Sequence, residues 1–150
     1  MGLFPKDVRI EDVNAKWLSR MDKELGLILT EIGENTLTAE LDVSEKNVQP
    51  FGIMHGGMSC VVGESLGSIA GALCLSDKTR TVVGQSLYAI HMRPAGLGMT
   101  LKAVAEARHL GQRSQVWEIL LTEKQQGKSI SKITLTLAVV AIKAEHQDKP

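Results

Sequence analysis

The chain alternates apolar and polar residues over much of its length, and this pattern predicts β-strands with one buried face. The alternation is clearest over residues 37–43 and 133–141. The sequence GEN, residues 33–35, is typical of a hairpin turn, and three later turns also contain Gly. Strands are therefore predicted over residues 25–32, 37–43, 81–92, 99–110, 115–123 and 129–142.

Two segments depart from this alternation and are predicted to be helical. Within residues 10–21, Val13, Trp17 and Met21 recur at helical spacing and are expected to face inward. The longer helix spans about residues 58–75, and it starts near residues 55–57 because PFGIMHGG cannot propagate a helix. One long helix among antiparallel strands indicates a single α+β domain, residues 1–150, with its core at about residues 25–142.

The long helix carries one charged side chain, Glu64, between His55 and Ser76. On a helical wheel, the stripe opposite Glu64 is apolar and is predicted to face the core: Val62, Leu66, Ile69 and Leu73. The face around Glu64 is small and otherwise uncharged: Gly57, Cys60, Val61, Gly67, Ser68 and Gly71. A solvated face normally carries charges. We therefore expect a second subunit to cover this face.

The same segment contains a GxxxGxxxG pattern, at Gly63, Gly67 and Gly71, which in an apolar helix is typical of a membrane dimer. Glu64 lies near its centre, where a carboxylate costs about 2.5–3.5 kcal/mol on insertion scales. No basic residues flank the segment to orient it. We therefore expect no membrane interaction, and the pattern fits a symmetric dimer in water better.

Composition narrows the possible functions. Lys and Arg total 17, as do Asp and Glu, and aromatic residues make up only 3%, so a nucleic-acid partner is not expected. The N-terminal residues lack the apolar core of a signal peptide, and the two Cys are expected to be buried, reduced thiols. We expect a cytoplasmic protein. Its polar tail, residues 143–150, is expected to be frayed.

Groups suited to acyl transfer gather around the helix start. Glu64 has Ser68 one turn later, on the same face. The backbone N–H groups of residues 55–57, at a helix N-terminus, favour a developing oxyanion, and Gln49 supplies an amide donor. Carbonyl-polarising donors beside a desolvated carboxylate are the equipment of acyl transfer to water. The alternative is structural: Glu64 is an interface acid that pairs with an arginine.

Three motifs carry a resemblance to a known family. QPFGIMHGGMSCVVGESLGSIAG, HMRPA and HLGQRSQVWEI resemble hotdog-fold acyl-CoA thioesterases of the PaaI-like type. The likeness is strongest to bacterial 1,4-dihydroxy-2-naphthoyl-CoA hydrolases and aryl-carrier-protein proofreading thioesterases, and it spans about residues 25–140. It implies a curved antiparallel sheet wrapped around the central helix. It also implies a homodimer that pairs further into a homotetramer, with the thioester bound between subunits.

The resemblance also implies roles for the residues around the thioester. Glu64 would act as the nucleophile or general base, and Ser68 would hold the attacking water. The backbone N–H of Gly56 and the side chain of Gln49 would polarise the carbonyl. His55 would lie near the leaving thiolate. His55 as a mere brace for its turn is the alternative.

Three further residues are expected to bind substrate by the same resemblance. His91 would line the acyl pocket, and Arg93 and Arg113 would lie near the coenzyme A phosphates. Two of them have a structural alternative: His91 could be a satisfied core histidine, and Arg93 could be a surface cation. The match is weaker at Arg113, where the family often places Ser or Thr beside a basic residue.

The sequence therefore predicts an acyl-CoA thioesterase that acts on aryl thioesters of coenzyme A or of a carrier protein. We expect no cofactor, since coenzyme A belongs to the substrate, and no metal, since no two His have ligand spacing. The alternatives are a hotdog-fold hydratase or dehydratase and a non-catalytic acyl-CoA-binding protein. Covalent and general-base hydrolysis both remain open, because Glu64 serves either.

Overall fold

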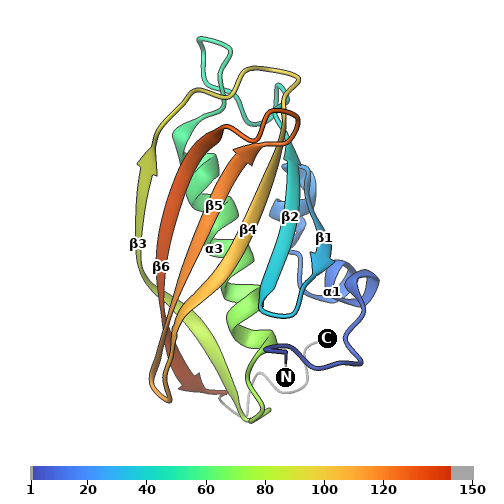
Figure 1. The fold of residues 1–150 in the computed structure, drawn as a ribbon, viewed down its shortest axis with the longest axis vertical. Coiled ribbons are helices and arrows are strands. Elements are labelled where there is room, and N and C mark those ends of the chain that lie inside the picture. The colour runs from blue at the N-terminus through green and yellow to red at the C-terminus, as the bar shows by residue number, and fades with distance from the viewer. Residues whose placement is uncertain (1, 143–150) are drawn as a thin grey trace.

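One antiparallel sheet curves around a single long helix in the computed structural model, which describes residues 2–142 (Figure 1). The prediction of an α+β fold with a curved sheet around a central helix is confirmed. The elements in chain order are α1 Ile10–Lys16, α2 Arg20–Glu24, β1 Leu27–Ile32, β2 Thr36–Asp42, α3 Gly56–Leu73, β3 Arg80–His91, β4 Thr100–Leu110, β5 Ser114–Glu123 and β6 Ser129–Ala141.

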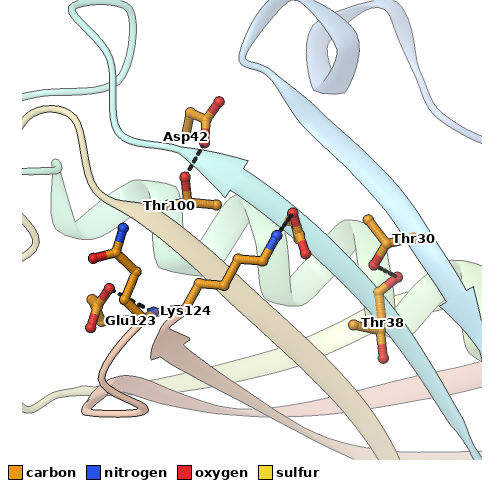
Figure 2. Close-up of polar contacts among 8 residues, drawn as sticks. Thr30, Thr38, Asp42, Thr100, Glu123 and Lys124 are labelled. Atoms are coloured by element: carbon orange, nitrogen blue, oxygen red, sulfur yellow. Dashed lines mark hydrogen bonds and ion pairs between the residues drawn. The ribbon is translucent and has the colours of Figure 1, made fainter.

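The strand order is β1-β2-β4-β5-β6-β3, so β1 and β3 form opposite edges of the sheet (Figure 1). Side-chain contacts connect β2 to β4 and to the turn that follows β5. Figure 2 shows Thr100, whose hydroxyl donates to Asp42 at 2.6 Å, and Lys124, which pairs with Glu40 at 2.8 Å. The β3 edge differs from the rest of the sheet because most of its side chains are exposed. It therefore presents unpaired backbone groups together with apolar side chains.

The apolar stripe predicted on α3 is buried against the sheet. Val62 and Leu66 are fully buried, and Ile69 and Leu73 are nearly so. The alternation predicted for β6 is confirmed as far as Val139, whereas Ala141 is exposed at the strand end. The sheet and this helix face together form one core.

The small residues of α3 pack against the protein's own sheet. A Cβ added to Gly67 would lie 2.6 Å from Leu135, and one added to Gly71 would lie 2.6 Å from Leu137. Contacts this short require glycine. The expectation that a second subunit covers Gly67 and Gly71 is therefore wrong. The sheet curves so far around α3 that it covers these glycines as well as the apolar stripe.

The N-terminal segment forms two short helices, and the prediction of one helix over residues 10–21 is wrong. Ser19 starts α2 with a capping box, in which its hydroxyl and the Asp22 carboxylate bind each other's backbone N–H groups. Val13 is buried as predicted. Trp17 and Met21 are 44% and 54% exposed, so the expectation that they face inward is wrong. The predicted frayed tail, residues 143–150, lies outside the described residues.

No helix within residues 2–142 is long and apolar enough to cross a membrane.

Candidate active site

A hollow of about 380 Å³ lies where the N-terminal end of α3 meets the end of β3. Gln49, Gly56, His91 and Arg93 are among its lining residues. A tight turn, in which the Gly52 N–H donates to the Gln49 carbonyl at 3.0 Å, shapes one wall. The structure thus brings together four of the predicted site residues from three separate parts of the sequence.

The Gln49 side chain is oriented by its own loop. Its Oε1 accepts a hydrogen bond from the Phe51 backbone N–H. Because the amide oxygen is engaged in this way, the Nε2 group is the part of Gln49 available to a ligand. An NH₂ group at the wall of the hollow suits a carbonyl oxygen, in agreement with the predicted role.

His55 caps α3. Its Nδ1 accepts a hydrogen bond from the Gly57 N–H at 2.9 Å. A neutral His55 therefore carries its proton on Nε2 and presents a donor outward. Capping accounts for the structural alternative raised for His55. It leaves the ring's other nitrogen available to a leaving group.

Gly56 opens the first turn of α3, where backbone N–H groups have no partner within the helix. The His91 ring lies directly against it, since a Cβ at Gly56 would lie 3.2 Å from His91 Nε2. His91 is exposed at the end of β3, so the alternative of a buried core histidine does not hold. The N–H of Gly56 and the imidazole of His91 are thereby placed side by side at the hollow.

Glu64 lies two turns further along α3 and is half buried. The Ser68 hydroxyl donates to its Oε1 at 3.5 Å. Across from it, a Cβ at Gly84 of β3 would lie 2.9 Å from the Glu64 Cδ. No Lys or Arg among residues 2–142 forms an ion pair with Glu64, so the arginine-paired alternative finds no partner in that part of the chain.

Gly84 was missed in the sequence, although a signal was present. The pairing of β3 with β6 shifts register between Gly84 and Ser86, which marks a bulge opposite the Glu64 carboxylate. An isolated glycine inside a strand pattern indicates a bulge or a close backbone approach. The sequence alone did not show which group approaches it.

The carbonyl donors and Glu64 of one chain are far apart. Eight residues separate Gly56 from Glu64, which is about 12 Å along the helix axis at 1.5 Å per residue. Reacting atoms need to approach within about 3–3.5 Å. In the described part of the chain, Gly56 lines the hollow at the start of α3 and Glu64 lines a different cavity, which does not include Gly56. A single chain therefore does not bring Gly56 and Glu64 together at one cavity.

Arg113 lies apart from Arg93. Arg113 is in the turn between β4 and β5, next to Gln112, whose carbonyl accepts from Arg80 at the start of β3 at 2.7 Å. Arg93 follows the end of β3, about 35–40 Å away along the strand. The guanidinium of Arg93 donates to the Ser129 carbonyl at 3.0 Å and lines the hollow with Gln49. The structure does not bring the two arginines together within one chain.

Comparison with known proteins identifies the family. A model of the thioesterase superfamily matches residues 51–130. The chain belongs to the thioesterase superfamily. It is 36% identical to the 1,4-dihydroxy-2-naphthoyl-CoA hydrolase of Escherichia coli, over 92% of this chain and 99% of that protein. It is 34% identical to the proofreading thioesterase EntH of Cronobacter sakazakii, over 92% and 98%.

A solved structure supports the same assignment. The crystal structure of a thioesterase from Haemophilus influenzae has a TM-score of 0.88 and 34% identity, covering 97% of this chain and 99% of that one. The predicted hotdog fold and thioester hydrolase activity are thus confirmed. The thioesterase family also favours hydrolysis over the hydratase and the non-catalytic alternatives.

Proposed function

We propose that this thioesterase hydrolyses aryl-CoA thioesters at a site shared between two subunits, with Glu64 as its catalytic carboxylate. The observation that carries the proposal is the separation of about 12 Å along α3 between Gly56 and Glu64. In a dimer, Glu64 of the second subunit would lie beside Gly56 of the first, and Glu64 of the first beside Gly56 of the second. The aryl acyl group is supported by the similarity to a hydrolase of a naphthoyl thioester.

In the proposed reaction, the thioester carbonyl accepts hydrogen bonds from the Gly56 N–H and the Gln49 side chain of one subunit. Glu64 of the second subunit removes a proton from water, or attacks the carbonyl carbon itself. Ser68 helps to hold the water. In the general-base route the hydroxide so formed adds to the carbonyl carbon, the C–S bond breaks, and the proton held by Glu64 goes to the leaving thiolate. In the covalent route the C–S bond breaks as an acyl-Glu64 anhydride forms; water then hydrolyses the anhydride, which restores the carboxylate and supplies the proton for the thiolate. In both routes the Nε2–H of His55 faces the leaving thiolate. No cofactor or metal is needed for these steps.

The proposed dimer forms through the exposed β3 edge. Gly56 contacts His91 and Glu64 contacts Gly84, so a two-fold axis that brings Gly56 to Glu64 also brings His91 opposite Gly84. That axis crosses β3 midway between His91 and Gly84. Antiparallel pairing of two β3 strands satisfies this requirement. It would cover apolar side chains that are 46–67% exposed: Val83, Tyr88 and Ile90.

Arg93 is proposed to face the coenzyme A phosphates, since it lines the hollow that holds the carbonyl donors. Arg113 would reach them only from another subunit. Two dimers are proposed to pair into a homotetramer, for which the family resemblance is the support. A thioester on an aryl-carrier protein is the second proposed substrate, supported by the similarity to a proofreading thioesterase.

The test is Glu64→Ala, measured by thiol release from benzoyl-CoA together with a melting curve. We expect turnover to fall by about 10²–10⁴-fold, as for a positioned base, with the melting temperature unchanged. Glu31→Ala, which removes an exposed carboxylate on the opposite edge strand, is the matched control. A folded Glu64→Ala protein within threefold of wild type would exclude Glu64 as the catalytic group.

A further inference from the structure

Two adjoining cavities run along α3 on the side where Glu64 lies. One, of about 330 Å³, is lined by Met21, Glu64 and Ser65 among others. The second, of about 200 Å³, is lined by Trp17, Ser65 and Ser68 among others. Both are lined by Ser65, so they lie next to each other along α3, and we call the two together the acyl trough.

The N-terminal helices supply the outer wall of the acyl trough. Trp17 follows α1 and Met21 lies in α2, and each lines one of the two cavities. They are large apolar side chains that remain 44% and 54% exposed. Trp17 thus lies at one cavity of the trough and Met21 at the other. An indole and a thioether facing an open cavity are suited to contact a flat apolar ring.

The wall is fixed to α3 beside Glu64. Asp22 is only 4% exposed, and its Oδ1 accepts from the Ser65 hydroxyl at 2.6 Å. Its Oδ2 accepts from the Ser19 hydroxyl at 2.6 Å and the Ser19 N–H at 3.0 Å. Hydrogen bonds to a charged carboxylate are among the stronger ones. Ser65, next to Glu64, is thereby bonded to Asp22, next to Met21.

We infer that the acyl trough receives the ring of the aryl thioester, with Trp17 and Met21 as specificity-determining residues. This rests on the proposed function, in which Glu64 lies beside the thioester carbon. The acyl group must then extend into space next to Glu64, and the acyl trough is that space. Both Asp22 oxygens are bonded to serines, so this carboxylate is not free to bind a ligand, and Trp17 and Met21 supply large apolar contacts for a ring.

The first experiment compares Trp17→Ala and Met21→Ala with wild type on benzoyl-CoA, 2-naphthoyl-CoA and acetyl-CoA. We expect kcat/KM to fall about tenfold on both aryl thioesters, mainly through KM, because binding contacts to the ring are lost. Acetyl-CoA has no ring and should change less than threefold. Met99→Ala is the matched control, since Met99 is 40% exposed and lines neither cavity. Met21→Trp should narrow the trough and impair 2-naphthoyl-CoA more than benzoyl-CoA.

The second experiment measures binding without turnover. S-phenacyl-coenzyme A is a thioether that resists hydrolysis, and the chain has two Trp, of which Trp117 is fully buried. Binding should change the Trp17 fluorescence, and Trp17→Phe should remove the change while calorimetry still detects binding.

Binding of S-phenacyl-coenzyme A without any change in Trp17 fluorescence would overturn the proposal that the acyl trough receives the ring. So would equal losses on aryl and acetyl thioesters in the first experiment. If wild type binds the thioether at Trp17 but does not hydrolyse benzoyl-CoA, the proposed function fails while the trough stands.

Discussion

Three neighbours surround Glu64, two from its own helix and one from β3. Ser68 binds its Oε1 from one turn later, Gly84 lets the strand approach its carboxylate, and Ser65 beside it is tied to Asp22. A carboxylate held in this way needs less reorganisation before attack than a free surface glutamate. These surroundings suit the proposed catalytic role of Glu64, which forms no ion pair with an arginine of the described chain.

His91 is the residue where ring recognition is expected to be polar. We expect His91→Ala to impair 4-hydroxybenzoyl-CoA more than benzoyl-CoA, by about 1–3 kcal/mol or roughly 5- to 150-fold in kcat/KM, because the bound hydroxyl loses its hydrogen-bond partner. The ratio of kcat/KM for the two thioesters is the measurement. Equal losses on both would mean that His91 only packs against Gly56 and does not recognise the ring.

At the scale of elements, sequence periodicity predicted those elements whose position depends only on burying one apolar face. The strands and the core stripe of α3 follow from alternation and helical spacing, and they are present. Features that depend on a contact distant in sequence were not predictable. The wheel could not show that the sheet curves far enough to cover Gly67. The break before Met21 instead has a local cause, the capping box of Ser19 and Asp22, which the helical spacing of apolar residues does not detect.

The sequence motifs indicated the candidate residues, and the resemblance implied a site between subunits; which of these residues lie together in one chain came from the structure alone. The motifs pointed to Gln49, Gly56 and Glu64, and the structure places the first two at one hollow. Glu64 lies elsewhere because helix rise separates it from Gly56. The role of Met21 as a trough residue had no signal in the sequence, since its spacing fits a core helix equally well.

Gly84 is the point where β3 lies against the carboxylate of Glu64, the proposed catalytic group. We expect Gly84→Ala to lower kcat at least tenfold with little change in melting temperature, because the new Cβ would lie 2.9 Å from the Glu64 Cδ and displace the carboxylate. Ser86→Ala, on the same exposed strand, is the control. Steady-state kinetics and a melting curve on each variant provide the check. Unchanged kcat in Gly84→Ala would show that the Glu64 position seen here is not the catalytic one.

At the scale of the whole molecule, the two-fold axis proposed for β3 also determines which residue of α3 lies nearest the axis. The midpoint between Gly56 and Glu64 is Cys60, so two copies of Cys60 are expected close to the axis. Burial raises the pKa of the Cys74 thiol, which leaves less reactive thiolate there at neutral pH. A short bismaleimide should therefore cross-link dimers through Cys60. Cys60→Ser should abolish the cross-link and Cys74→Ser should not, as followed by denaturing electrophoresis; cross-linking that survives Cys60→Ser would contradict the axis.

Mixing inactive subunits tests whether the site itself crosses the interface. Glu64→Ala subunits keep the carbonyl donors, and Gln49→Ala subunits keep the carboxylate. After exchange through mild denaturant, random pairing makes about half of the dimers hybrids, and each hybrid has one complete site and one empty of both groups. About a quarter of all sites should therefore regain wild-type turnover of benzoyl-CoA. If Gln49 and Glu64 act within one chain, no pairing can rebuild a site, and the mixture would stay at the average of the two variants.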